Sequence, residues 1–140
     1  MTIFGDGLQT RAFSYIDDVA PAIARAPITS GCYQEVFNIG ADRPYSVLEL
    51  AKEIASAFGV PASIVHLEAR NEVVDAYASH EKARNMFDLP APVALRLGIE
   101  RMARWVRTRG VATPVEFGDI EVSIGIPNSW LPKPNREVLK

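Results

Sequence analysis

The sequence of 140 residues is poor in sulfur and imidazole ligands, with one cysteine, Cys32, and two histidines, His66 and His80. One cysteine cannot form an internal disulfide, so we expect a protein of the reducing cytoplasm. Two histidines without nearby cysteines or clustered carboxylates argue against a zinc site, and we predict no bound metal. We expect structural roles for all three residues.

The chain also lacks strong net charge and long apolar runs. Its 15 basic and 17 acidic residues give a formal charge of -2, which offers no electrostatic basis for binding nucleic acid or an anionic membrane. No apolar run approaches 18 residues, and no charged leader precedes an apolar region, so neither a membrane span nor a signal peptide is predicted. The hydrophobic fraction of 48% predicts a soluble, folded chain with its own core.

The motifs that usually announce catalysis or cofactor binding are missing as well. There is no G-x-G-x-x-G after a first strand, no G-K-S/T phosphate loop and no G-x-S-x-G elbow. Tyr77 is followed four positions later by Glu81, where an active-site Tyr-x-x-x-Lys pair requires lysine. We therefore predict no catalytic residue and no cofactor-binding residue within this chain.

The most informative stretch that is present runs from Ile3 to Asp18. Gly5-Asp6-Gly7 is typical of a turn in which the backbone angle φ must be positive. Gln9 and Arg11 follow in an alternating run, which predicts that Arg11 lies on a half-buried strand. A guanidinium fixed on a strand offers a planar fork to phosphate oxygens.

The remaining periodicity indicates an α/β fold with short strands and about four helices. Strands are predicted at residues 35–39 and 63–67, each bounded by loop-forming residues. Asp17 and Asp18 are expected to cap the first helix. A capping box at 46–49 is expected to start the second helix, which ends near Phe58, and Ser79 is expected to cap the third. The fourth helix is expected at 93–109, with an inward face made of Leu95, Ile99, Met102 and Val106.

A second arginine, Arg70, stands beside Glu72 in a polar loop at 68–75. Two arginines from separate segments could clamp a pyrophosphate, with Gln9 or Asn38 near them and a carboxylate or amide accepting from ribose hydroxyls. Spacing alone leaves open the alternative that these are solvated surface residues.

The order and spacing of five segments resemble a known family. The segments are IFGDGLQTRAFSYIDDVAPAI, FNIG, SVLELAKEIA, EARNEVVDAYASHEKARNMF and ALRLGIERMARWV. They are similar to extended short-chain dehydrogenase/reductases that act on nucleotide sugars, especially UDP-sugar 4-epimerases and their decarboxylase and dehydratase relatives. The resemblance implies the C-terminal, substrate-binding lobe of such a protein, with an incomplete parallel sheet. We expect this lobe at residues 1–112 and a Pro-rich extension at 113–140 that packs on it and ends in disorder.

The resemblance also implies site residues for a UDP-sugar ligand. The backbone around Thr2 and Phe4 would face the nucleobase, while Arg11 and Arg70 would contact the diphosphate with Gln9 and Asn38 nearby. In relatives, a Pro-Gly-Asp motif follows the second arginine and its acid meets the ribose. Asn71-Glu72-Val73 stands here instead, so Glu72 is the candidate substitute.

Family members bind NAD and carry the Tyr-x-x-x-Lys pair in a portion that would precede Thr2. We therefore expect no NAD bound to this chain alone and no epimerase activity from it. The strand at 35–39 would complete the sheet of that portion, so its unpaired edge predicts self-association or a nucleotide-binding half as partner. The alternative is a non-catalytic nucleotide-binding or protein-interaction module. The sequence does not separate epimerase from decarboxylase or dehydratase, nor does it identify the sugar.

Overall fold

The computed structural model describes residues 1–113 and residue 124. The chain divides into two compact units, Met1–Gly110 and Val111–Lys140, and all the helices and strands given below lie in the first. The expected packing of the Pro-rich extension concerns residues outside this description, apart from Ile124, which is an exposed turn residue.

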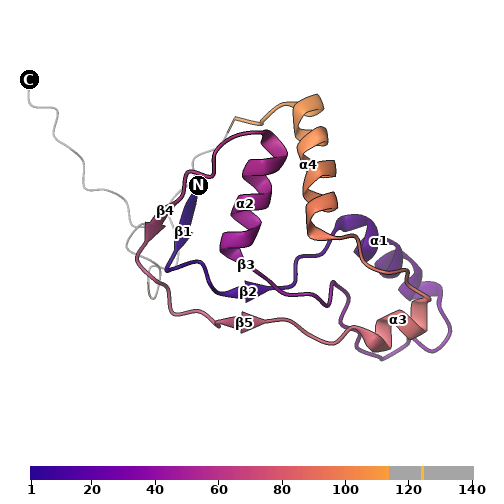
Figure 1. Cartoon of the computed structure of the whole chain (residues 1–140). Coiled ribbons are helices and arrows are strands. Elements are labelled where there is room, and N and C mark those ends of the chain that lie inside the picture. The colour runs from indigo at the N-terminus through magenta and orange to yellow at the C-terminus, as the bar shows by residue number, and fades with distance from the viewer. Residues whose placement is uncertain (114–123, 125–140) are drawn as a thin grey trace, which may run out of the picture. The chain divides into compact units, whose positions relative to one another are not determined.

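The strands form two small sheets (Figure 1). In the first, β1 (Thr2–Phe4) pairs in parallel with β4 (Val65–Leu67), which confirms the predicted strand at 63–67 in shortened form. In the second, β2 (Thr10–Arg11) lies between antiparallel β3 (Tyr45–Ser46) and parallel β5 (Asp75–Ala76). Because β1 parallels β4 and β2 parallels β5, the connections β1–β2 and β4–β5 run side by side. This arrangement creates the site described below.

Helix α2 (Val47–Phe58) forms as its sequence predicts. The hydroxyl of Ser46 accepts a hydrogen bond from the backbone N–H of Glu49 at 3.0 Å, and the Glu49 carboxylate accepts from the backbone N–H of Ser46 at 2.7 Å. The backbone and hydroxyl bonds from Ser46 lower the pKa of Glu49. The helix ends at Gly59, which has φ of +71°.

Helix α4 (Leu95–Arg109) packs against α2, but through smaller side chains than the sequence suggested. Leu95 is buried as predicted, whereas Met102 is 55% exposed, so its predicted inward position is wrong. Gly98 and Ala103 are buried instead, and at Gly98 a Cβ atom would lie 3.2 Å from the Tyr15 ring. Close approach of neighbouring elements thus favours small residues over the larger apolar stripe.

Helix α1 (Ile16–Arg25) continues into a 3-10 turn at Ala26–Ile28. The predicted cap is wrong, because Tyr15 is the N-cap residue and makes no side-chain capping bond. Asp18 lies in the first turn, where its carboxylate accepts from the backbone N–H of Val93 at 2.8 Å. Asp18 therefore ties the segment that precedes α4 to the start of α1.

Helix α3 (Glu81–Phe87) packs near α1 around a small core of Ala22, Ala83 and Phe87. Its N-cap residue is the buried His80, and the Ser79 hydroxyl reaches the backbone N–H of Glu81 only at 3.5 Å. A small apolar cluster holds this side of the fold.

The imidazole of His80 is held in place by one carboxylate. Its Nδ1 lies 2.9 Å from Asp42, whose carboxylate also pairs with Arg84. The hydrogen bonds from His80 and Arg84 lower the pKa of Asp42. This network gives His80 the structural role expected from the sequence.

The predicted strand at 35–39 does not form. Phe37 packs its ring on Phe87, with centroids 5.3 Å apart, while Val36 is 81% exposed. The Lys82 ammonium donates to the Glu35 carboxylate at 2.6 Å and to the carbonyl of Val36 at 3.0 Å, and it lowers the pKa of Glu35. A strand requires a paired neighbour, and none of the described residues supplies one to this segment.

Across residues 1–113 and 124, no helix is long and apolar enough to span a bilayer. The same residues contain no group of three or more side chains that could hold a metal ion.

Candidate functional site

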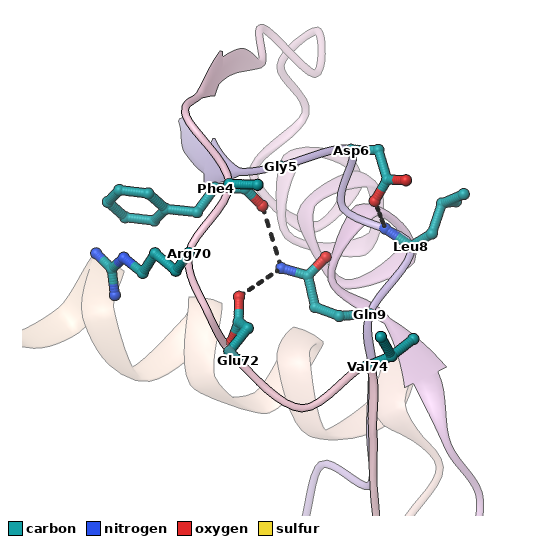
Figure 2. A pocket seen from close by; sticks show the side chains of 9 residues that line it. Phe4, Gly5, Asp6, Leu8, Gln9, Arg70, Glu72 and Val74 are labelled. Carbon is teal, nitrogen blue, oxygen red and sulfur yellow. Dashed lines mark hydrogen bonds between the residues drawn. The ribbon is translucent and has the colours of Figure 1, made fainter. Parts of the chain in front are cut away.

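A pocket of about 260 Å³ lies where the β1–β2 and β4–β5 connections run side by side (Figure 2). The first connection contributes Phe4, Gly5, Asp6, Leu8 and Gln9, and the second contributes Ala69, Arg70, Glu72 and Val74. Four of the seven predicted site residues, Phe4, Gln9, Arg70 and Glu72, therefore line a single pocket.

The glycine turn directs the first connection along this pocket. Gly5 has φ of +70° and Gly7 has φ of +79°, so the predicted need for positive φ is confirmed. The Asp6 carboxylate accepts from the backbone N–H of Leu8 at 2.9 Å, and the backbone N–H of Gly5 donates to Leu67 of β4 at 3.0 Å. These bonds fix the turn on β4 and bring Gln9 back towards Phe4.

One wall of the pocket is a stacked pair, Phe4 and Arg70. The guanidinium carbon of Arg70 lies 3.2 Å from the centroid of the Phe4 ring. A guanidinium over an aromatic face keeps its charge and is attracted by the negative face of the ring. The wall therefore offers both an apolar ring and a positive charge to a ligand.

Gln9 and Glu72 connect the two sides of the pocket. The Gln9 amide nitrogen donates to the carbonyl of Phe4 at 3.2 Å and to the Glu72 carboxylate at 3.2 Å (Figure 2). The two residues lie 63 positions apart in the chain. Only the parallel pairing of the strands brings them together.

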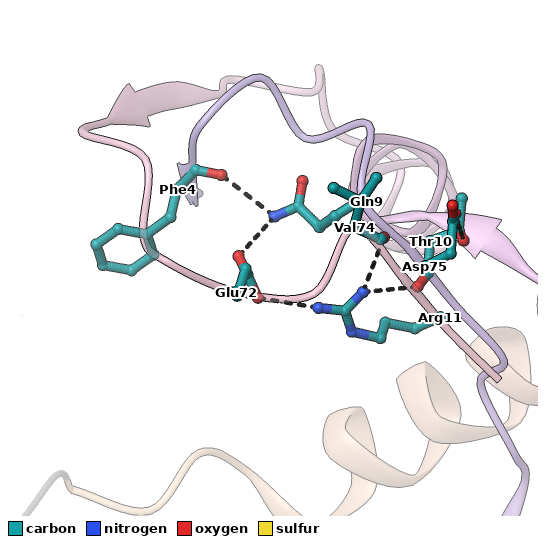
Figure 3. A network of polar contacts seen from close by, with 7 residues as sticks. All are labelled: Phe4, Gln9, Thr10, Arg11, Glu72, Val74 and Asp75. Carbon is teal, nitrogen blue, oxygen red and sulfur yellow. Dashed lines mark hydrogen bonds and ion pairs between the residues drawn. The ribbon is translucent and has the colours of Figure 1, made fainter.

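Arg11 does not line the pocket but contacts Glu72, which does (Figure 3). Its Nη1 donates to the carbonyls of Thr10 at 2.7 Å and Val74 at 3.1 Å, and its Nη2 donates to the Glu72 carboxylate at 3.0 Å. The Arg11 side chain is 27% exposed, so the predicted half-buried position on a strand is confirmed. The backbone thus orients the guanidinium, and one carboxylate neutralises it.

The two other predicted residues, Thr2 and Asn38, do not line the pocket. Thr2 pairs with Val65 at the start of β1, and Asn38 is exposed in the segment that packs on α3. Their predicted roles therefore have no contact in the pocket to support them.

Sequence reasoning did not identify the apolar part of the lining. Leu8 and Val74 flank the polar residues, one on each connection. The signal available was their position next to Gln9 and within the loop at 68–75. Neither residue belongs to a motif, so this signal was weak.

Known proteins resemble the chain in both sequence and structure, although no protein-family model matches it. A putative UDP-glucose 4-epimerase of Methanocaldococcus jannaschii is 35% identical over 106 residues, which cover 75% of this chain and 33% of that protein. UDP-glucuronic acid decarboxylase 4 of Arabidopsis thaliana is 30% identical over 113 residues, covering 78% and 24% of the two chains.

A solved structure gives the same result for the fold. UDP-glucuronic acid 4-epimerase from Bacillus cereus, determined with UDP-glucuronic acid and NAD, superposes with a TM-score of 0.68 at 31% identity. The match covers 76% of this chain and 35% of that one, and the chain spans about a third or less of the curated relatives named above. The chain thus matches the C-terminal portion of extended short-chain dehydrogenase/reductases, in the family of NAD-dependent nucleotide-sugar epimerases and their relatives.

Proposed function

We propose that this chain is the nucleotide-sugar-binding portion of a 4-epimerase-type protein and that Arg11 and Arg70 bind the diphosphate of a UDP-sugar. The observation that carries this proposal is the convergence of Phe4, Gln9, Arg70 and Glu72 on one pocket, with Arg11 bonded to Glu72 behind it. The Bacillus cereus relative was determined with a UDP-sugar, which supports the choice of ligand class.

The roles follow from the chemistry of each group. Arginine forks match the paired oxygens of phosphates, and Arg11 is already oriented by two backbone carbonyls. The backbone around Phe4 would face the base, since Arg70 covers one face of the Phe4 ring. Glu72 would accept from ribose hydroxyls.

We expect this chain alone to bind no NAD. The glycine turn after β1 leads into β2, whereas a dinucleotide site places the pyrophosphate on the N-terminus of a helix that follows the glycines. The chain also has no Tyr-x-x-x-Lys pair. We therefore expect no interconversion of UDP-glucose and UDP-galactose when NAD is added to the purified 140 residues. Measurable turnover in a coupled assay would contradict this part of the proposal.

Calorimetry with UDP and UDP-glucuronic acid tests the binding site. We expect Arg11→Ala to weaken UDP binding about tenfold or more, because a hydrogen bond between a partly buried guanidinium and a phosphate contributes on the order of 1.5–3 kcal/mol. Arg96→Ala is the matched control, since Arg96 is exposed on α4 and pairs only with Glu100 among the described residues. Unchanged affinity in Arg11→Ala would refute the assigned role, and no UDP binding at all would favour the interaction-module alternative.

We further propose that exposed apolar side chains on the α1 side contact another protein surface, either a second copy or a nucleotide-binding half. The exposed residues include Ile16, Ile23, Ile28, Tyr33 and Val36. Light scattering should detect self-association that Ile23→Lys weakens about tenfold, because the charge would have to be desolvated in the contact. Val60→Lys, at a 55%-exposed position after the end of α2, is the control. A monomeric wild type at high concentration would argue against the second-copy form.

A further inference from the structure

Glu72 occupies the polar groups that a diphosphate would need. One carboxylate oxygen accepts from Nη2 of Arg11 at 3.0 Å, and the other accepts from the amide of Gln9 at 3.2 Å (Figure 3). The carboxylate thus lies between the pocket and the guanidinium.

The donors of Arg11 can be counted one by one. Nη1 directs two hydrogen bonds to the backbone carbonyls of Thr10 and Val74, so these bonds hold the guanidinium without help from Glu72. Nη2 directs one hydrogen bond to Glu72. Within the described residues, Nε and the second Nη2 hydrogen make no hydrogen bond. Nε–H and the second Nη2–H therefore remain for a phosphate, next to the Glu72 carboxylate that occupies the first Nη2–H.

The Glu72 carboxylate and a bound diphosphate carry charges of the same sign. A diphosphate bound at Nε and Nη2 of Arg11 would lie next to the Glu72 carboxylate. The two negative groups would then share one guanidinium and would repel each other. The Glu72 side chain is 39% exposed and stands in a connecting loop, so it can turn away from Arg11 at low cost, towards a ribose hydroxyl where the ligand has one and towards solvent where it has none. Its departure would release Arg11 and Gln9 together.

We propose that Glu72 is an internal competitor of the ligand: its carboxylate neutralises Arg11 in the free chain, and a diphosphate ligand must displace it. The inference rests on the proposed diphosphate role of Arg11. It assigns to Glu72 a control of affinity that the family resemblance alone does not contain.

The test compares binding of inorganic pyrophosphate and of UDP to the ¹⁵N-labelled chain by NMR titration. Pyrophosphate contains no ribose, so its affinity reports only the competition between its phosphate groups and Glu72 for Arg11. Glu72→Gln keeps the shape of the side chain and should bind pyrophosphate about fivefold more tightly, the order expected for removing one partly exposed competing charge. Glu68→Gln is the matched control, because Glu68 is an exposed carboxylate of the same loop. The affinity of this variant for pyrophosphate should equal that of the wild type.

A second variant guards against a misfolded first one. Glu72→Asp keeps the charge but shortens the reach to Arg11, so its affinity gain should be smaller than that of Glu72→Gln. If the wild type binds UDP and Glu72→Gln binds neither ligand more tightly, the competitor role is overturned while the diphosphate site stands. If no variant and no wild-type sample binds either ligand, the diphosphate site falls, and the competitor role falls with it.

Discussion

The pocket side and the α1–α3 side of the first unit are held together by different forces. At the pocket, glycine turns and hydrogen bonds between two parallel connections fix the backbone, and Phe4 and Arg70 stack at the edge. On the α1–α3 side, three buried residues form a small apolar core, and the segment at 35–39 rests on it without a strand partner. The pocket side is thus fixed by backbone hydrogen bonds, whereas the α1–α3 side depends on a small apolar core and leaves apolar side chains such as Val36 exposed.

The two sides also differ in whether their backbone segments are paired within the first unit. Every strand at the pocket has a partner, so the geometry of the site depends on contacts within this unit. Among the described residues, the segment at 35–39 has no strand beside it, and Val36 is exposed there. We therefore expect the pocket side to respond to changes in backbone geometry and the other side to respond to loss of apolar volume.

The largest effect should come from the apolar side. Phe87→Ala removes a 3%-exposed ring that packs on Ala22, Ala83 and Phe37, so the free energy of unfolding should fall by about 3 kcal/mol. Urea denaturation followed by circular dichroism measures this change. Trp105→Ala, at a 62%-exposed position on α4, should change stability by no more than about 0.5 kcal/mol. Similar losses in the two variants would show that the small core does not hold this side.

A smaller effect should come from the backbone at the pocket. Gly7→Ala must adopt φ of +79° and place its Cβ 3.2 Å from Ile3, so we expect a loss of about 2 kcal/mol. Gly59→Ala is the matched control, because it shares a positive φ of +71° but meets no atom within 4 Å. Its loss should be about 1 kcal/mol. Equal losses from denaturant melts would mean that the contact with Ile3 relaxes freely.

The smallest effect should be a change in acid sensitivity on the α1–α3 side. The pKa of Asp42 is lowered in the folded chain, so its carboxylate stabilises the fold above the ordinary value of 3.8, and this contribution is lost as the pH falls through the lower folded value. Asp42→Asn should therefore be less stable near neutral pH and should lose less stability than the wild type between about pH 5 and pH 3. Thermal melts across this range measure the difference. Asp88→Asn, which removes a carboxylate without an ion pair in the described part, should follow the wild-type profile.

Much of the pocket side could be read from local sequence. Gly5-Asp6-Gly7 demanded positive φ, the alternating run put Arg11 on a half-buried strand, and the capping box at 46–49 fixed the start of α2. Each of these signals acts over a few residues. The backbone has few other ways to satisfy them, so the structure agrees.

The errors came from positions whose state depends on a distant partner. The segment at 35–39, bounded by loop-forming residues, predicted a strand, but pairing requires a neighbour that the described residues do not provide. Met102 fits a helical apolar stripe, yet the close approach at Gly98 and Ala103 determines which face of α4 is buried. The carboxylate of Asp18 holds Val93 across 75 positions of chain, which no local capping rule anticipates.

The sequence by itself determined the α/β class, the four helices, the glycine turn and the identity of the charged groups at the site, because these depend on propensity and spacing. Only the tertiary structure decided that Gln9, Arg11 and Glu72 meet, since parallel pairing of β1 with β4 and of β2 with β5 lays two connections side by side. It also decided that Glu72 neutralises Arg11. A contact across about 60 positions is set by strand register, and register is a property of the folded sheet.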